Sequence, residues 1–193
     1  MRKTALLEVI AGKNLGLGAT ETDKQAILSA IANLEDFNPT PRPLESGDLL
    51  DGNWRLIYTT SSELLNLNRI PLTNLSKIYQ CIRLKTKSVY NIAEINALPF
   101  LDGLVSVTAK FEPVSPIRVQ VKFERSIIGL RRLIDYKYPG NFIEDIESGK
   151  KFLAIDFPIK SNEQQGWLDI TYLDNDLRIG RGNQGSVFVL TKS

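Results

Sequence analysis

Hydrophobic and polar residues alternate with a period of two along much of the chain. The alternation is clearest at residues 53–59, 104–112, 117–125 and 167–173. In the second of these segments, Val105, Val107 and Phe111 fall in one phase, while Ser106 and Lys110 fall in the other. A strand with one apolar and one polar phase has one buried face and one wet face, which is typical of antiparallel sheet.

More strands are predicted by further apolar runs, near residues 76–85, 87–97, 152–158, 176–181 and 185–191. Turn residues separate these runs, and residues 130–150 predict a long loop or a short helix. A meander of this length, without intervening helices, must close or fold over to protect its edges. We therefore expect a mainly β fold, an antiparallel barrel of eight or nine strands with room for packed side chains or one small ligand.

A helical period precedes the first strand. Residues 2–11 can form a short helix, and a second helix is predicted by an apolar stripe of Ile27, Leu28, Ile31 and Leu34. Thr20 can cap this second helix, with Asp23 completing a capping box. Three prolines within residues 38–43 end it. We expect an N-terminal helical segment at 1–43 and a barrel at 44–193.

The amino-acid composition excludes several classes of catalytic and metal site. The chain has 193 residues, of which 42% are hydrophobic and 24% charged, and no apolar run is long enough to span a membrane. It has no histidine, which excludes Ser-His and Cys-His catalysis and histidine-liganded zinc. Cys81 is the single cysteine and lies in a strand-like run, where a core position is expected. We predict no enzyme, no metal site and no cofactor. The first residues are too short and too charged for a secretory signal, so an intracellular protein is expected.

Two motifs near the end of the chain have competing interpretations. Gly180, Gly182 and Gly185 have the spacing of a dinucleotide-binding loop, but the β-branched and aromatic residues that follow cannot form the required helix. A tight turn between two strands explains these glycines better. Asp174 and Asp176 suggest calcium, but their flanks fit no ligand loop, and a hairpin turn is favoured.

Basic residues are concentrated in the middle of the chain, since residues 52–93 hold six basic side chains and one acidic. This excess suits an anionic lipid surface, or a solvated sheet edge guarded by lysines. Nucleic acid is not expected, because the aromatic residues do not interleave with the charges. The candidate surface residues are the apolar loop positions Leu64, Leu65 and Leu67, together with Arg69, Lys77, Arg83 and Lys85.

The apolar phase of the strands predicts the lining of the barrel. Gly52 and Trp54 open the first strand with the G-x-W pattern of lipocalin-type barrels, in which an arginine from the last part of the barrel stacks across the indole. Arg181 and Arg125 both fall in the apolar phase of their strands, with Trp54 or Glu94 as candidate partners. Alternatively, both arginines lie at strand ends in solvent. The candidate lumen residues are Trp54, Leu56, Tyr58, Val107, Phe111, Val121, Phe123, Arg125, Ile170, Tyr172 and Arg181.

Three segments carry a resemblance to a known family. "LDGNWRLIYTTSSELL" at 50–65, "VKFERSIIG" at 121–129 and "YLDNDLRIGRGNQGSVFVL" at 172–190 resemble the plastid lipid-associated protein, or fibrillin, family over nearly the whole chain. The resemblance implies a lipocalin-like fold without established catalytic residues, and association with thylakoids, plastoglobules or carotenoid-rich bodies. Plant members carry a transit peptide, so a chain beginning as this one does is expected to be cyanobacterial or trimmed.

Three classes of function stay open. We expect non-enzymatic binding of a hydrophobic small molecule (a lipid, quinone or carotenoid), with association at a thylakoid membrane or lipid globule and a role in photoprotection. The alternative is a peripheral structural or scaffold protein on lipid surfaces, whose lumen holds no specific ligand. An enzyme is the third class, and no residues are spaced as an acid–base pair.

Overall fold

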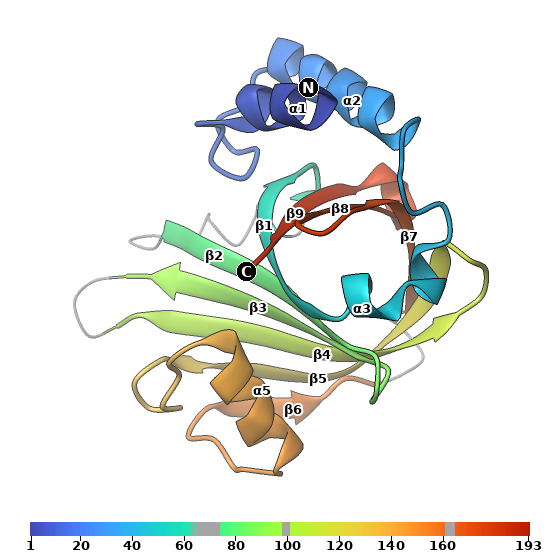
Figure 1. Cartoon of the computed structure of the whole chain (residues 1–193). Helices are drawn as coiled ribbons and strands as arrows, with labels where there is room; N and C mark the ends of the chain where they lie inside the picture. The colour runs from blue at the N-terminus through green and yellow to red at the C-terminus, as the bar shows by residue number, and fades with distance from the viewer. Residues whose placement is uncertain (63, 65–73, 98–100, 161–164) are drawn as a thin grey trace.

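The computed structural model describes residues 1–62, 64, 74–97, 101–160 and 165–193. In that part of the chain, nine strands form a single antiparallel sheet (Figure 1). The strands are β1 (Gly52–Thr59), β2 (Asn74–Arg83), β3 (Ser88–Asn96), β4 (Gly103–Pro113), β5 (Arg118–Leu130), β6 (Ile155–Pro158), β7 (Gln165–Leu173), β8 (Leu177–Gly182) and β9 (Val187–Lys192).

The sheet closes on itself. Its order is β4-β3-β2-β1-β9-β8-β7-β5-β6, and β4 also pairs with β5, so eight strands form a ring and β6 lies outside it. The predicted mainly β fold, an antiparallel barrel with N-terminal helices, is confirmed. Closure gives each of the eight ring strands a partner on both sides, which is how a long meander protects its backbone groups.

Helices cover the outside of the ring and one of its ends (Figure 1). They are α1 (Arg2–Ile10), α2 (Glu21–Glu35), α3 (Gly47–Leu50) and α5 (Pro139–Glu147), with short 3₁₀ turns η1 (Pro43–Glu45) and η3 (Asn183–Gly185). Helices α1 and α2 lie above β1, β9, β8 and β7, α5 lies below β4 and β5, and α3 lies across the near end of the ring. Thr20 and Asp23 form the predicted capping box at the start of α2.

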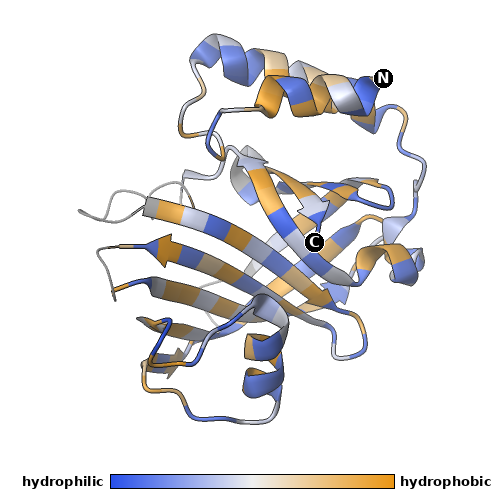
Figure 2. Cartoon of the chain, turned by 60° about the vertical axis from the view of Figure 1, so that its left-hand side comes forward, coloured by the Kyte–Doolittle hydropathy of each residue, from blue (hydrophilic) through white to orange (hydrophobic). Residues whose placement is uncertain are grey.

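The hydrophobic residues pack in three clusters rather than one. One lines the barrel interior and its end beside α3, and includes Trp54, Leu56, Phe111 and Ile170. A second packs α1 and α2 against the outer face of β1, β7, β8 and β9. A third lies beneath α5 on the outer face of β2 to β5. Many strands are therefore apolar on both faces, and Figure 2 shows hydrophobic residues recurring along most of them.

The N-terminal segment is fastened to the backbone of the ring by hydrogen bonds. The amide of Thr59 donates to the carbonyl oxygen of Leu15 over 2.9 Å. Gly16 has φ +110°, and a Cβ there would lie 2.5 Å from the Thr59 carbonyl oxygen, so this close approach needs glycine. Further on, the side-chain amide of Asn38 donates to the carbonyl oxygen of Thr171 over 3.0 Å. The helices are thus held at both β1 and β7.

Neither ambiguous motif forms a ligand loop: the glycine cluster ends a strand and turns at Gly185, and Asp174 opens a hairpin turn. Gly180 and Gly182 lie in β8, and Gly185 ends η3 with φ +71° before β9 begins, so the glycine cluster joins two strands. The Asp174 carboxylate accepts hydrogen bonds from the amides of Asp176 at 3.0 Å and Leu177 at 2.7 Å. This is the hairpin turn that the sequence favoured over a calcium loop.

Candidate functional site

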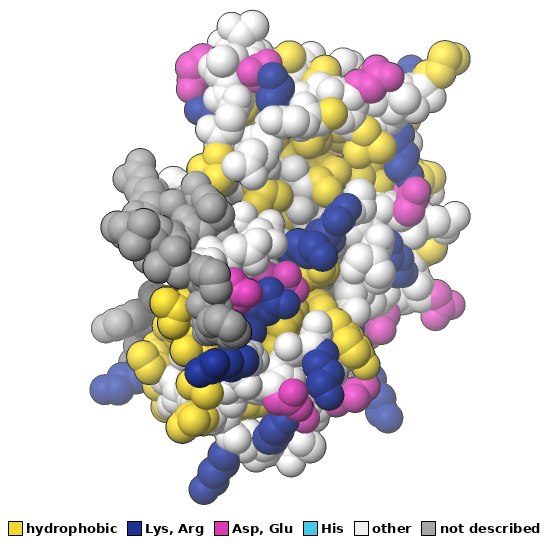
Figure 3. Space-filling view, turned by 90° about the vertical axis from the view of Figure 1, so that its left-hand side faces the viewer, with side chains coloured by type: hydrophobic (Ala, Val, Ile, Leu, Met, Phe, Trp, Pro, Cys, Tyr) yellow, Lys and Arg dark blue, Asp and Glu magenta, His cyan; other side chains and the backbone are white. Residues whose placement is uncertain are grey.

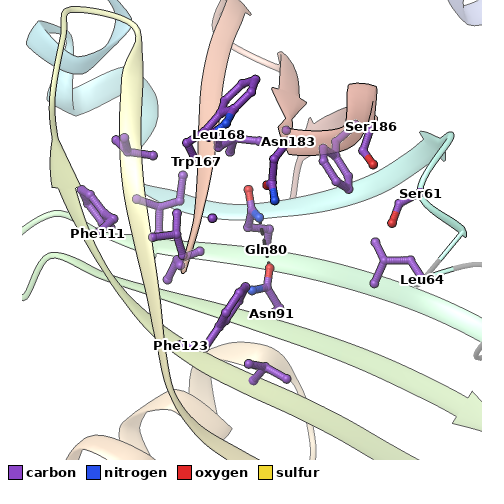
Figure 4. A pocket seen from close by; sticks show the side chains of 18 of the residues that line it. Ser61, Leu64, Gln80, Asn91, Phe111, Phe123, Trp167, Leu168, Asn183 and Ser186 are labelled. Carbon is purple, nitrogen blue, oxygen red and sulfur yellow. Dashed lines mark hydrogen bonds between the residues drawn. The ribbon is translucent and has the colours of Figure 1, made fainter. Parts of the chain in front are cut away.

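A cavity of about 910 Å³ occupies the barrel interior. Leu44 and Leu50 line it at the end that α3 covers, and Ser61, Leu64 and Ser186 line it at the other end. Figure 4 shows this arrangement, with the side chains of Ser61 and Leu64 well separated from Phe111 along the cavity. We call the α3 side the closed end and the Ser61 side the open end. A cavity of this size is typical of small-molecule sites.

Most of the cavity wall is apolar. Six of the predicted lumen residues line it, namely Leu56, Val107, Phe111, Val121, Phe123 and Ile170. Leu168 and Phe188 contribute further apolar surface. Trp54 is completely buried at the closed end, where its Nε1 donates to the carbonyl oxygen of Leu50 over 2.9 Å. The indole therefore fastens the first strand to α3, which closes the barrel.

Three other predicted lumen residues lie outside the cavity because of β-bulges. The register shifts between Leu56 and Tyr58 in β1, and between Ile170 and Tyr172 in β7. Each shift reverses which face the following residues present. Tyr58 and Tyr172 consequently pack in the cluster beneath α1 and α2. The prediction that Tyr58 and Tyr172 line the lumen was therefore wrong.

The same effect moves Arg125. Strand β5 has a bulge at Glu124. Its neighbours Phe123 and Arg125 pair with consecutive residues of β4, Ala109 and Thr108, so Glu124 is the extra residue. Phe123 lines the cavity, but Arg125 turns outward and binds both carboxylate oxygens of Asp156, at 2.8 and 2.6 Å. Its predicted position in the lumen was wrong, and Ser126 takes the inward place.

Arg181 also faces outward. It binds the Glu35 carboxylate of α2 at 2.9 and 2.6 Å. The apolar phase of β8, formed by Leu177 and Ile179, packs against the helices, so it does not mark the lumen. The opposite phase faces inward and places Arg178 against Trp54. The sequence analysis missed Arg178. A signal was present, because Arg178, Gly180 and Gly182 share one face of β8, and that face lies toward the lumen.

A polar group is set into the closed end of this apolar cavity. The guanidinium carbon of Arg178 lies 5.1 Å from the centroid of the Trp54 ring, and the residue is only 1% exposed. Its Nη2 donates to Oε1 of Gln80, whose Nε2 donates to Oδ1 of Asn91 over 3.0 Å. Figure 4 shows Gln80 and Asn91 bonded to each other part of the way along the cavity. Burial lowers the pKa of Arg178 to about 9.

The remaining titratable candidates lie outside the lumen. Glu94 is on the outer face of β3, where it accepts a hydrogen bond of 2.8 Å from the hydroxyl of Tyr136, so it is no partner for Trp54 or for an inward arginine. Cys81 is buried in the cluster beneath α5. Burial raises the pKa of its thiol to about 12, which leaves a core residue rather than a nucleophile.

The open end is formed where β5 changes partners. The first part of β5 pairs with β7 over Arg118–Lys122, and the part after its bulge pairs with β6 over Arg125–Ile128. The face that lines the cavity therefore continues onto β6. Phe157 lines the cavity and is 43% exposed. Ile155 is 65% exposed and pairs with Ile128, which is 39% exposed. We call Ile128, Ile155 and Phe157 the apolar lip.

The predicted surface residues do not form one patch. Leu65, Leu67 and Arg69 lie outside the described residues. Leu64 lies at the open end, while Arg83 ends β2 at its opposite end and Lys85 follows it, beside the closed end. Arg83 is also engaged, since its Nη2 donates to Oδ1 of Asn53 over 2.9 Å. Lys77 is exposed midway along β2. Figure 3 shows basic side chains spread among acidic and hydrophobic ones on the face it presents.

Within the described ranges, no three acidic or cysteine side chains are grouped so that they could hold a metal ion. No helix in those ranges combines the length and the hydrophobicity needed to cross a membrane.

A closed antiparallel barrel with an apolar cavity and a tryptophan at its closed end defines a lipocalin-like protein. The profile of the PAP_fibrillin family matches residues 1–191. The chain belongs to this family, which confirms the resemblance carried by the ends of the barrel sequence. No solved structure matches the chain.

Curated relatives come from plant plastids. The chain is 37% identical over 217 residues to a light-induced chloroplastic protein of Solanum tuberosum, covering 98% of this chain and 66% of the relative. It is 34% identical to a chromoplast-specific carotenoid-associated protein of Cucumis sativus (98% and 67%) and 36% identical to plastoglobulin-1 of Pisum sativum (98% and 60%). None of these names denotes a reaction. The chain spans about two thirds of the length of these relatives.

Proposed function

We propose that this chain binds a hydrophobic small molecule, such as a lipid, quinone or carotenoid, inside its barrel, and that it does so at the surface of a thylakoid membrane or lipid globule. The cavity of about 910 Å³ with its largely apolar wall carries the proposal. Apolar surface that faces a cavity gains free energy when an apolar ligand covers it, at roughly 25 cal/mol per Å². The relatives named for carotenoids and plastoglobules support the same class of cargo.

The apolar lip supports the second part of the proposal. Ile155 and Phe157 are large hydrophobic side chains at the rim of the open end, and both are substantially exposed. Exposed lysines Lys151 and Lys160 flank β6 on either side. Apolar side chains flanked by lysines suit insertion at an anionic lipid surface. Docking through the lip would place the open end of the cavity at the lipid, so that cargo need not cross water.

Uptake by the delipidated chain tests the lumen. We expect saturable binding of a neutral fluorescent polyene such as diphenylhexatriene, displaced by a carotenoid or a prenylquinone. Val121→Trp, which fills the cavity wall, should weaken uptake by about tenfold or more. Val114→Trp is the matched control, because Val114 is 57% exposed beside the closed end. Absence of saturable uptake by the folded wild-type chain would contradict lumen binding and favour a structural protein of lipid surfaces.

Flotation with liposomes tests the surface. Ile155→Asp combined with Phe157→Asp should reduce flotation on vesicles containing anionic lipid, whereas Val114→Asp should leave it unchanged. Lys85→Glu examines the basic residues near the closed end in the same assay. If only Lys85→Glu reduces flotation, the chain docks through its closed end and the role of the lip is wrong.

A further inference from the structure

Arg178 carries a buried positive charge that its surroundings only partly satisfy. The residue is 1% exposed, and its Nε and Nη1 have no hydrogen-bond partner among the described residues. These two nitrogens carry three of the five N–H donors of a guanidinium. Only Nη2 is bonded, to Oε1 of Gln80, which is a neutral acceptor. Buried donors without acceptors are uncommon in proteins, so each requires an explanation.

The aromatic contact of Arg178 does not supply the missing anion. The Trp54 ring lies beneath the guanidinium, at 5.1 Å, but the ammonium nitrogen of Lys192 also lies 5.3 Å from the same ring. Two cations therefore lie near one aromatic ring. The ion pairs formed within the described ranges do not include Arg178. Burial lowers the pKa of Arg178 to about 9, which still leaves the side chain mainly charged at neutral pH.

The position of this charge relates it to the cavity. Arg178 lines the cavity at the closed end, opposite the open end marked by Ser61 and Leu64. The wall between the two ends is mainly apolar, with the bonded pair of Gln80 and Asn91 next to the arginine. The cavity therefore offers a cationic donor at its floor and a hydrophobic shaft above it. A cavity with a cation at one end and an apolar wall along its length matches an amphiphile that has one anionic end and a hydrocarbon tail.

We propose that the lumen takes a long-chain amphiphile head first, with an anionic head, a carboxylate or a phosphate monoester, paired with the guanidinium of Arg178, whose Nε and Nη1 lack acceptors. The hydrocarbon tail then lies along Val121, Phe123 and Leu168 toward the open end. This inference rests on the proposed lumen binding and deepens it, because it names the chemical class of the cargo. A neutral carotenoid or hydrocarbon leaves the three N–H donors unpaired and is the poorer ligand.

Ligands that differ only in their head group test the inference. Hexadecanoic acid, hexadecyl phosphate and methyl hexadecanoate are compared by displacement of diphenylhexatriene from the delipidated full-length chain. We expect one or both anions to bind at least about tenfold more tightly than the ester, and their ranking identifies the head group. Equal affinity for acid, phosphate and ester would overturn the inference while leaving the proposed function intact. Failure of the chain to bind diphenylhexatriene or any competitor would contradict the proposed function itself.

A matched pair of variants locates the anion. Arg178→Met should remove the preference for the anion over the ester, while Arg181→Met, two residues along the same strand and on its outer face, should preserve it. If Arg178→Met does not fold, Trp54 provides a second readout in a Trp167→Phe chain. A saturating anion that binds the guanidinium above the indole should change Trp54 fluorescence, and the ester should not. An identical fluorescence response to anion and ester would overturn the inference.

Discussion

The guanidinium of Arg178 lies over the indole of Trp54, with 5.1 Å between the guanidinium carbon and the ring centroid. This contact joins β8 to β1 across the closed end, although β9 separates the two strands in the sheet. Leu50 of α3 accepts a hydrogen bond from the same indole. Trp54 therefore connects the helix that closes the barrel with two of its strands.

Removal of this indole should destabilise the barrel strongly. Trp54 is completely buried, and replacing a large core aromatic with alanine costs about 3–5 kcal/mol. Trp54→Ala is expected to lower the free energy of unfolding by that amount, measured by urea denaturation followed by circular dichroism. Trp167 is the control, because it is half-buried and stacks under Arg118 at 4.0 Å. Trp167→Ala should cost about 1 kcal/mol, and equal losses for both variants would contradict this assignment of the core.

The helix layer should loosen when its ion pair with the barrel is removed. Glu35 binds Arg181 through two hydrogen bonds, and its side chain is 15% exposed. Glu35→Ala is expected to lower the free energy of unfolding by about 1 kcal/mol, and to raise amide hydrogen exchange in α1 and α2. Glu21→Ala serves as the control, since Glu21 is 84% exposed and forms its ion pair with Lys24 of the same helix. Unchanged exchange in the helices would show that the pair does not fasten them.

The turn before β8 should make stability depend on acidic pH. Burial alone raises the pKa of Asp174, but the Asp176 amide, the Lys3 ammonium and the Tyr172 hydroxyl outweigh it and hold the pKa below its usual range. A carboxylate with a lowered folded-state pKa stabilises fully above its unfolded-state pKa of about 3.9, and that stability is lost as the pH falls toward the folded-state value.

Asp174→Asn isolates this contribution. The variant should unfold at a lower temperature than the wild type at pH 7, and the gap should narrow as the pH falls from about 5 to 3. Thermal unfolding at a series of pH values measures the gap. A gap that stays constant over this range would show that ionisation of Asp174 does not stabilise the fold.

The polar pair beneath α5 should be sensitive to loss of one hydroxyl. The hydroxyl of Tyr136 donates a hydrogen bond of 2.8 Å to the buried Glu94 carboxylate. Burial has the largest effect on the pKa of this phenol and raises it, and the neighbouring carboxylate raises it further. Tyr136→Phe leaves the carboxylate without this donor and should cost about 1–3 kcal/mol. Tyr138→Phe is the matched control at a site that is 58% exposed, and it should be neutral. Denaturation midpoints of the two variants compare them directly.

Sequence alone could predict the barrel because its strands alternate so regularly. The helix cap at Thr20 and the turn at Asp174 also depend on local chemistry, and both were confirmed, whereas of the three glycines only Gly185 lies in the predicted turn. The division into a helical segment at 1–43 and a barrel at 44–193 stays a prediction. Local signals of this kind are strong because a few neighbouring residues determine the backbone conformation.

The lumen residues were harder to predict, for two physical reasons. A bulge reverses the phase of a strand without any clear mark in composition, and the extra residues Ile57, Glu124 and Thr171 each did so. The second reason is that helices cover part of the outer face, so Leu177 and Ile179 are apolar although they face away from the cavity. Hydrophobicity then marks burial, but it does not distinguish inside from outside.

The fastening of the helices also determines when they can dock. Lys3 binds Asp174, Asn38 binds Thr171, and Glu35 binds Arg181, so each contact joins the beginning of the chain to strands near its end. During synthesis, α1 and α2 leave the ribosome before β7 and β8, so they must wait for those strands before these contacts can form. A chaperone that shields the apolar stripe of α2 in that interval would protect nascent chains from premature association.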